Sequence, residues 1–272
     1  MRVFAIKNEY DEKEPVCAYL LYYEISRRFF IEITDNCDEW DVPVFLSSFV
    51  KRNIRTVSQK WSRVWVRQRI VPTDRQNLGQ ILRENGLKSY DEFDLLMLSS
   101  GRCAQDDYFL TEISEEMLPF EIKKRRKKLI EDAVALEDNT LLVFFCDGAV
   151  KKIRVDGFTD KNPKLRTLFS ARPDVFKSVK LQTGGYELYW DENTCISCYE
   201  LYESGRNVPL TLDDFRAFAE CRIITAAEAA EELGCSRQNI DDLVKRGKLK
   251  TVKKTEKTTL FLKSDVLKRE WK

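Results

Sequence analysis

The side chains best suited to chemistry lie near the carboxyl end of the chain, between residues 237 and 257, where eight lysines and arginines accompany three carboxylates. Ammonium and guanidinium groups bind phosphates, and the counterions released by this contact supply much of the affinity of a protein for DNA. Gln238 matches the edge of adenine, whereas Arg237 and Lys245 match a guanine or a phosphate. The segment therefore predicts contact with double-stranded DNA.

Helical spacing predicts which of these side chains share a face. Ile240, Leu243 and Val244 recur at the spacing of a buried stripe. The residues on the opposite face are then Gln238, Asp242 and Lys245, flanked by Asp241 and Arg246. The two adjacent carboxylates count against DNA contact, because phosphates repel them unless one accepts a hydrogen bond from cytosine.

The full set of residues expected at DNA adds Arg237, two helix caps and five following lysines to this face. The lysines are expected on the DNA backbone or in a minor groove. The set is Thr225, Ser236, Arg237, Gln238, Asp241, Asp242, Lys245, Arg246, Lys248, Lys250, Lys253, Lys254 and Lys257.

A helix-turn-helix is the element predicted to position these residues. Thr225 can cap a first helix, and Glu228 three residues later completes a capping box. Small apolar residues follow at helical spacing, after which Gly234 ends the first helix and Ser236 caps the second. Gly247 ends the second helix, so the segment predicts two helices joined by a tight turn.

A two-stranded wing is predicted after the second helix. Residues 250–263 alternate around Val252, Leu260 and Leu262 and carry a charged tip. Ser264 or Asp265 is then expected to cap a last helix that continues through Trp271.

This segment resembles the winged helix-turn-helix of MerR-like and phage-excisionase-like proteins. The matching residues are Thr225-x-x-Glu228-Ala229-Ala230, Leu233-Gly234, Ser236-Arg237, Gly247-x-Leu249 and Asp265. The resemblance covers the last fifth of the chain and implies binding to double-stranded DNA.

Other chemistries lack the residues that they need. The chain contains no histidine, which removes the mechanisms that depend on imidazole. Cys195 and Cys198 form one Cys-x-x-Cys pair, but a zinc site needs four ligands and no second pair is present. This stretch is expected to be loop and strand, without a helix amino terminus that would lower a thiol pKa. We therefore expect no metal, no cofactor and no enzyme activity.

Charged and aromatic residues of the amino-terminal part are expected to be structural. Asp106 and Asp107 are adjacent, so on a strand they would face opposite sides. Arg102 is expected to pair with Asp106 as a structural ion pair. The aromatic residues expected in the core are Trp61, Trp65 and Phe93.

Composition describes a globular chain of several domains. Its 272 residues are 43% hydrophobic and 33% charged, with a net charge of +1. The sequence has no long apolar run and no signal peptide, and its eight cysteines are expected to be reduced thiols in a cytoplasmic protein with no membrane partner. The basic run 123–128 and the polar stretch 203–207 mark two boundaries. The expected organisation is α+β and multidomain: two small α+β domains, 1–118 and 129–205, followed by a winged helix-turn-helix at 211–272.

The two leading domains carry weaker patterns. Residues 141–155 and 179–190 predict two hairpins, with Phe169, Phe176 and Trp190 in the core between them. The second domain resembles an uncharacterised bacterial domain that accompanies helix-turn-helix modules, on Phe145-x-Asp147-Gly148, Phe176-x-x-Val179, Gly185-x-x-Leu188-x-Trp190 and Glu200-Leu201-Tyr202. The first is similar to the amino-terminal subdomain of HipA-like kinases, on Arg69-Ile70-Val71-Pro72, Phe93-Asp94-Leu95-Leu96 and Gly101-Arg102, but no kinase core follows. These resemblances imply oligomerisation or docking of a protein partner.

Three functions follow from the sequence. The first is a bacterial, sequence-specific transcriptional regulator, an antitoxin-like autorepressor if the HipA-like similarity holds. One module buries only roughly 600–1,000 Å², so specificity needs two copies and predicts a homodimer. The alternatives are an excisionase-like architectural or recombination accessory factor and a protein-interaction adaptor that does not touch DNA.

Overall fold

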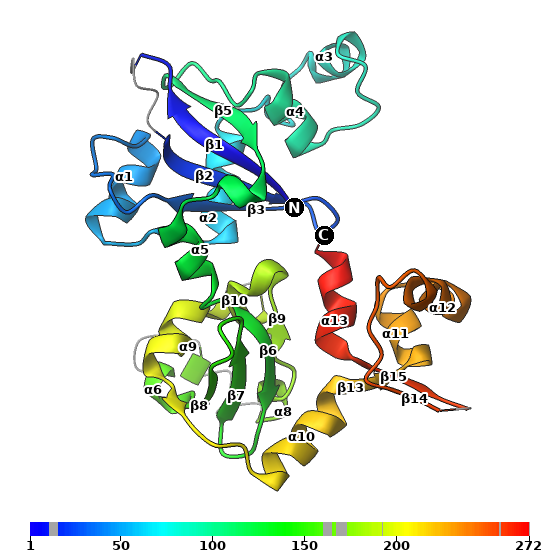
Figure 1. Cartoon of the computed structure of the whole chain (residues 1–272). Coiled ribbons are helices and arrows are strands. Elements are labelled where there is room, and N and C mark those ends of the chain that lie inside the picture. Colours follow the sequence, from blue (N-terminus) through cyan, green and yellow to red (C-terminus); the bar gives the residue numbers. More distant parts are fainter. Residues whose placement is uncertain (11–15, 160–164, 167–172, 192, 256, 272) are drawn as a thin grey trace. The chain divides into compact units, whose positions relative to one another are not determined.

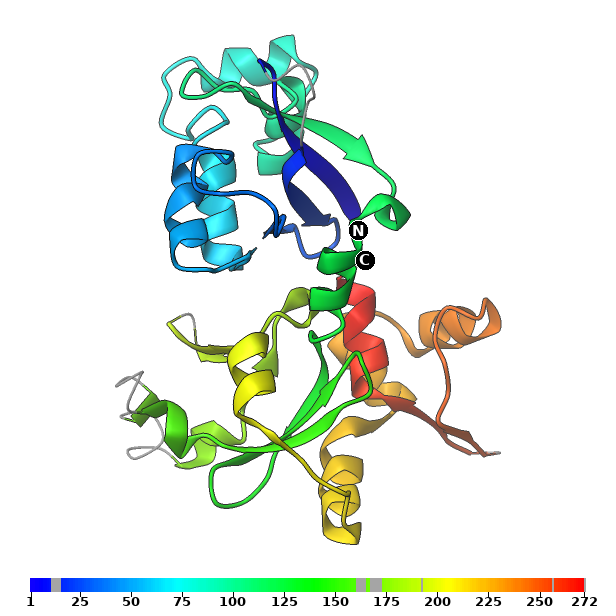
Figure 2. The same cartoon turned by 60° about the vertical axis from the view of Figure 1, so that its left-hand side comes forward.

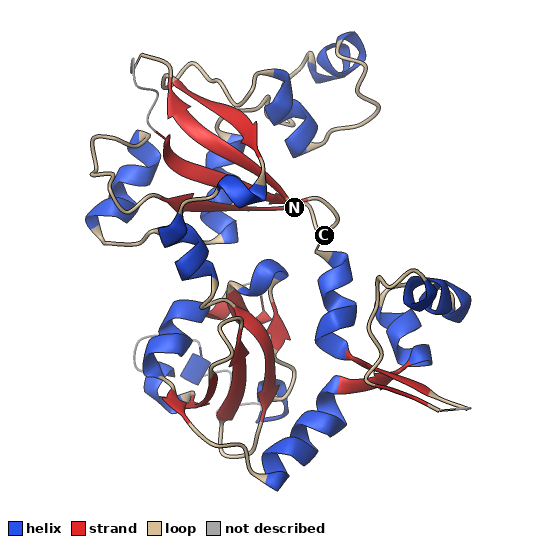
Figure 3. Cartoon of the chain, in the orientation of Figure 1, coloured by secondary structure: helices blue, strands red, loops and turns tan. Residues whose placement is uncertain are grey.

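The computed structural model describes residues 1–10, 16–159, 165–166, 173–191, 193–255 and 257–271. It is an α+β protein with several separate sheets, and it divides into two compact units at residues 1–123 and 124–272 (Figures 1 and 3). No helix in the described part of the chain has both the length and the apolar character needed to span a bilayer. The division of the second unit into domains 129–205 and 211–272 stays a prediction.

The first unit is built on a five-stranded antiparallel sheet in the order β4-β3-β2-β1-β5. Alternating and continuous apolar residues explain these strands, and β2 is buried at nearly every position. Short helices follow within the same unit. The strands are β1 (Arg2–Asn8), β2 (Val16–Tyr23), β3 (Arg28–Ile33), β4 (Thr56–Val57) and β5 (Tyr108–Ile113); the helices are α1 (Val44–Lys51), α2 (Gln59–Arg67), α3 (Leu78–Glu84), α4 (Glu92–Leu98), the 3₁₀ turn Glu115–Met117 and α5 (Phe120–Arg126), which reaches the boundary between the units.

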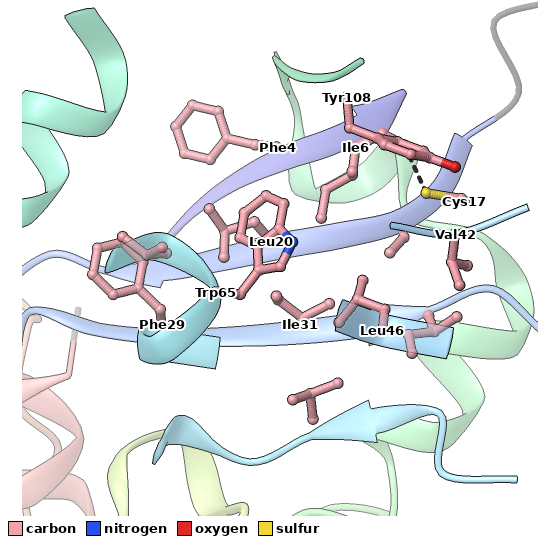
Figure 4. Close-up of a cluster of buried hydrophobic side chains, with 14 of the residues drawn as sticks. Phe4, Ile6, Cys17, Leu20, Phe29, Ile31, Val42, Leu46, Trp65 and Tyr108 are labelled. Atoms are coloured by element: carbon pink, nitrogen blue, oxygen red, sulfur yellow. Dashed lines mark hydrogen bonds between the residues drawn. The ribbon is translucent and has the colours of Figure 1, made fainter. Parts of the chain in front are cut away.

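The core of this unit lies between one face of the sheet and helices α1, α2 and α4. Trp65 is buried on α2 among Leu20, Phe29 and Ile31 of the sheet (Figure 4). The Cys17 thiol donates a hydrogen bond to the carbonyl of Ile6 at 3.4 Å, and burial is the main reason that the pKa of this thiol is raised. Cys17 is therefore a core residue.

The ion pairing around Asp106 differs from the sequence expectation. Asp106 pairs with Arg69, while Arg102 pairs with Glu9 at 3.3 Å on the surface. The Arg69 guanidinium also donates to the carbonyl of Gly101 at 2.9 Å, and its side chain is only 2% exposed. The expected Arg102–Asp106 pair was wrong because a long-range contact, across 37 positions of sequence, places a buried cation beside Asp106.

Two of the three expected core aromatics of this unit are buried, and one is not. Trp65 and Phe93 lie in the core. Trp61 is 45% exposed and packs against α1, edge-on to Phe49 and tilted against Phe45. It lies four residues before Trp65, so helical spacing alone could not separate a core position from the rim of the α1–α2 contact.

The second unit contains three sheets, which the second view separates more clearly (Figure 2). A four-stranded sheet has the order β12-β8-β7-β6, and a three-stranded sheet has the order β11-β10-β9. Their strands are β6 (Ile130–Ala135), β7 (Thr140–Phe145), β8 (Val150–Arg154), β9 (Lys180–Leu181), β10 (Glu187–Asp191), β11 (Thr194–Ser197) and β12 (Arg206–Asn207); the helical segments are α6 (Asp156–Thr159), α8 (Pro173–Phe176), the 3₁₀ turn Thr183–Gly185 and α9 (Cys198–Ser204). The third sheet belongs to the carboxyl-terminal segment.

Both expected hairpins of this unit are present. β7 pairs with β8, and β9 pairs with β10, each antiparallel. Phe176 and Trp190 are buried with ring centroids 6.2 Å apart, as expected, whereas Phe169 lies outside the described residues. Gly185, at φ +81°, brings its backbone against the carbonyl of Ile130, and a side chain there would collide with that strand.

The Cys195–Cys198 stretch differs from the expected loop and strand. Ser197 caps α9 with a capping box to Glu200, so Cys198 is the first residue of a helix. It is nevertheless fully buried. Burial, followed by the nearby Glu187, raises the pKa of the Cys195 thiol to about 12. The helix start thus does not make this pair a reactive dithiol.

Loss of the Asp106 carboxylate, which is partly exposed, is expected to destabilise the first unit by about 3 kcal/mol, because it leaves the buried Arg69 guanidinium without its counterion. Asp106→Ala is compared with Glu9→Ala, which removes the exposed pair to Arg102 and is expected to cost less than about 1 kcal/mol. Urea denaturation followed by tryptophan fluorescence measures both, since Arg69 lies 4.0 Å from the Trp65 ring. Equal losses in the two variants would contradict the structural role assigned to Asp106.

Candidate nucleic-acid interface

The carboxyl-terminal segment forms a module of short helices and a small sheet, with a hydrophobic core of its own. Its elements are α10 (Leu212–Arg222), β13 (Ile223–Thr225), α11 (Ala226–Glu232), α12 (Arg237–Lys245), β14 (Lys253–Lys254), β15 (Thr259–Leu262), α13 (Lys263–Leu267) and the 3₁₀ turn Lys268–Glu270. Ala229 and Ala230 are buried on α11 and allow α12 to pack closely through Ile240. The other buried members of this core are Ile224, Leu249, Phe261 and Val266. The predicted pair of helices is therefore confirmed.

The wing differs from the two strands expected from the sequence. The sheet has three strands in the order β13-β15-β14, because Ile223–Thr225 pairs with β15 before the first helix begins. Phe261 is fully buried, whereas Val252 is 48% exposed, so the expected alternation had the wrong phase. The reason is that β15 is the central strand and turns Phe261 onto α11 and α13, which no local pattern of residues 250–263 reveals.

The ends of the two helices are fixed by caps and by a glycine. The Thr225 hydroxyl accepts from the backbone amide of Glu228 at 3.3 Å and donates to its carboxylate at 2.8 Å. Ser236 caps α12 by accepting from the amide of Asn239 at 3.3 Å. Gly234 takes φ +57°, the left-handed conformation that ends α11. Two of the residues expected at DNA, Thr225 and Ser236, thus have hydroxyls that are used within the protein.

The last helix begins before the expected caps. α13 starts at Lys263, and its N-cap is Leu262, without a side-chain hydrogen bond. Ser264 is buried and Asp265 lies in the first turn, so neither caps the helix as expected. The strand β15 runs directly into α13, and Phe261 and Val266 anchor the two elements to the same core.

The outward face of α12 has the composition expected from helical spacing. Ile240 is fully buried and Leu243 and Val244 are half-buried against the core. The exposed residues of the helix and its end are Arg237, Gln238, Asn239, Asp241, Lys245, Arg246 and Lys248. Asp242 is half-exposed and lies 3.8 Å from the Lys245 ammonium. Asn239 was missed by sequence reasoning, although its position one turn into a capped helix was the signal that could have found it.

Two of the lysines of the wing lie on the strand β14. Lys253 and Lys254 form β14 and pair in register with Leu260 and Thr259 of β15. All four basic residues expected here are exposed, namely Lys250, Lys253, Lys254 and Lys257. Glu256 of the expected charged tip lies outside the described residues. The structure therefore brings the basic ends of α12 and the basic wing into one small module.

The module is joined to the four-stranded sheet through α10. Phe218 packs edge-on against Phe144 of β7 with ring centroids 5.1 Å apart. The Arg222 guanidinium donates to the Asp132 carboxylate of β6 at 2.6 Å, and both side chains are almost fully buried. α10 then continues into β13 without a linker. The orientation of the helix-turn-helix is thus tied to this sheet.

A second ion pair supports the start of α10. Asp214 lies 2.7 Å from the Lys152 ammonium of β8 and forms a capping box with Thr211. Burial raises the pKa of Asp214, but the hydrogen bonds from Lys152 and Thr211 outweigh it, so the pKa lies below its ordinary value. A depressed folded-state pKa adds stability that is complete above the unfolded value, about 3.9, and is lost as the pH falls through the folded value.

Comparison with known proteins agrees with this geometry. Residues 223–269 match the family model described as a helix-turn-helix domain. The chain matches no curated protein and no solved structure at a significant level. The carboxyl-terminal segment is therefore a helix-turn-helix domain, a fold that binds DNA, and the resemblances of the two leading parts stay predictions. In the part of the chain that the structure describes, no three carboxylates or thiols are grouped as a metal site.

Charge reversal in the wing is expected to weaken DNA binding without unfolding the module, because Lys253 and Lys254 are exposed. Lys253→Glu with Lys254→Glu is expected to lower affinity for any duplex at least about tenfold and to reduce the slope of log affinity against log salt by about 2. Lys60→Glu with Lys88→Glu makes the same charge change at exposed positions of the first unit. Fluorescence anisotropy with labelled duplexes measures both, and equal losses would show that only net charge matters.

Proposed function

We propose that this protein is a sequence-specific DNA-binding transcriptional regulator. The observation that carries the proposal is the exposed face of α12, where Gln238 and Lys245 project from a helix locked by Ile240 beside a basic wing. In helix-turn-helix domains the second helix enters the major groove, and its amino-terminal residues contact base edges. α12 supplies hydrogen-bonding groups at that end, and the wing supplies phosphate contacts.

DNA is a better partner for this surface than a protein. An adaptor surface would be expected to expose large apolar or aromatic anchors at its centre. The exposed residues of α12 are instead polar or charged, and the lysines cluster on the wing and the carboxyl end of the helix. This arrangement supports a polyanionic partner. Replacement of the wing lysines would leave an adaptor active and would disable a DNA-binding protein.

The rest of the chain is proposed to control binding rather than to catalyse a reaction. The Arg69–Asp106 and Arg222–Asp132 pairs join elements of the fold, and we assign both of them a structural role. The first unit is proposed to receive a protein partner, as the HipA-like similarity implies, which would make the chain an antitoxin-like autorepressor. We also propose that the protein acts in a bacterial cytoplasm.

We further propose that two copies bind together, using the free face of α10. Leu212 and Phe215 lie one turn apart on this helix and are 75% and 59% exposed. Leu210 is half-exposed just before them. Stable dimers bury about 800 Å² on each partner, far more than three side chains provide. The contact is therefore expected to form between copies that DNA already holds close together.

The function is tested by titrating the protein onto a fluorescent fragment of its own upstream region and onto a scrambled duplex, across a range of salt. Tight, salt-dependent binding with a preference for the upstream fragment is expected. The Gln238→Ala, Lys245→Ala double variant is expected to bind both duplexes alike, because it removes base contacts. Equal binding of both duplexes by the unmodified protein would overturn the proposal, and bending of DNA with cooperative coating would favour an excisionase-like role.

The pairing surface is tested by the stoichiometry of the protein–DNA complex in sedimentation experiments. Two chains are expected on the upstream fragment, and one chain when Leu212 and Phe215 are both replaced by aspartate. Leu98→Asp with Met117→Asp alters two exposed apolar residues of the first unit and is expected to leave two chains bound. An unchanged stoichiometry in the α10 variant would exclude this helix as the contact.

A further inference from the structure

The charges on α12 change sign along the length of the helix. Arg237 stands at the amino end, and Lys245 and Arg246 stand at the carboxyl end, while the middle of the helix carries Asp241 and Asp242. Asp241 is exposed and Asp242 is half-exposed. The middle of the helix is therefore acidic within a basic surface.

Carboxylates restrict what can lie opposite them on DNA. Phosphates line both edges of the major groove and repel a carboxylate, so a carboxylate is tolerated only toward the base edges at the centre of the groove. The hydrogen-bond donors on those edges are the amino groups of cytosine and adenine. An acidic residue on the outward face of α12 must therefore meet one of these amino groups.

Asp242 occupies that face, and Asp241 lies beside it. Ile240 is buried, and successive residues of a helix are rotated by 100° about its axis. Asp242 therefore lies in line with Gln238, which is one turn earlier in the helix. It also lies close to Lys245, which is three residues later. The Asp242 carboxylate and the Lys245 ammonium are 3.8 Å apart. The outward face therefore presents an acceptor and a donor side by side, following the amide of Gln238.

This pair matches the major-groove edge of a C·G base pair. Cytosine presents its N4 amino donor on one side, and guanine presents the O6 and N7 acceptors on the other. In an A·T pair the amino donor lies between two acceptors, so a carboxylate that reached it would also face acceptor atoms. Across the major groove, a C·G pair thus presents one donor followed by acceptors. A carboxylate followed by an ammonium group is complementary to this order.

We propose that Asp242 and Lys245 together recognise one C·G base pair, with the Asp242 carboxylate accepting from cytosine N4 and the Lys245 ammonium donating to guanine. The inference rests on the proposed function and adds to it a base pair that the DNA site must contain. Gln238, one turn toward the amino end, contacts a neighbouring position. Asp241 contributes no base contact and only repels the backbone.

The test uses the full-length protein and duplexes from a randomised pool. The preferred site is selected with the unmodified protein, and each position is then replaced in turn by the other base pairs. One C·G position is expected whose replacement weakens binding about tenfold or more. Asp242→Asn is expected to reduce this discrimination to less than about threefold at that position alone.

Asp241→Asn is the matched control, because it makes the same charge change one residue away. Both variants are expected to bind a scrambled duplex more tightly than the unmodified protein, since each removes one carboxylate from a surface near phosphates. Asp241→Asn is expected to keep the preference for C·G. This gain on scrambled DNA also shows that each variant is folded.

The outcomes separate the two proposals. A clear site preference that Asp242→Asn leaves intact, or that Asp241→Asn loses to the same extent, would overturn the recognition of C·G and leave the regulator function standing. The absence of any preference over scrambled DNA in the unmodified protein would overturn both.

Discussion

The burial of Ile240 is the contact on which the proposed interface depends. It fixes the rotation of α12 about its own axis, because Ile240 belongs to the same close-packed cluster as Ala229, Ala230 and Phe261, and the other faces of the helix are polar. The identity of every outward side chain follows from that rotation. A shift by one residue would turn Gln238 and Lys245 toward the edge of the helix and bring Asp241 to its centre. Packing inside the module therefore determines which bases are accessible outside it.

In the proposed function, the lysines of the wing and the polar residues of α12 have different roles. The lysines of the wing are proposed to attract any duplex, and they carry no information about sequence. The polar and acidic middle of α12 is proposed to lower that general attraction and to gain affinity only where base edges supply donors and acceptors. In this proposal the module loses part of its non-specific affinity and gains discrimination between sequences. The proposed pairing of two copies fits this division, since each module alone offers few base contacts.

The parts of the structure that depend on local sequence were predictable, and the parts that depend on distant contacts were not. Thr225 with Glu228, Ser236 and Gly234 gave the helix boundaries, because caps act through neighbours within three residues. The strand Ile223–Thr225 and the burial of Phe261 were missed, because both result from pairing with residues more than 30 positions away. The partner of Asp106 and the exposure of Trp61 were wrong for the same reason. Apart from Asn239, the outward residues of α12 followed from spacing, and so did the nearness of Asp242 to Lys245, because residues three apart on a helix are neighbours.

The family match begins at residue 223, but the physical unit does not. Cutting the chain there would remove Phe218 from Phe144 and would leave the Asp132 carboxylate buried without Arg222. An exchange of DNA-binding modules between related chains would therefore succeed only if α10 moved together with the β6 and β7 residues that it covers. The sheet and the helix-turn-helix are therefore expected to be inherited as one piece, and the position at which evolution or an engineer can recombine this protein is the boundary between the two compact units, at residues 123 and 124.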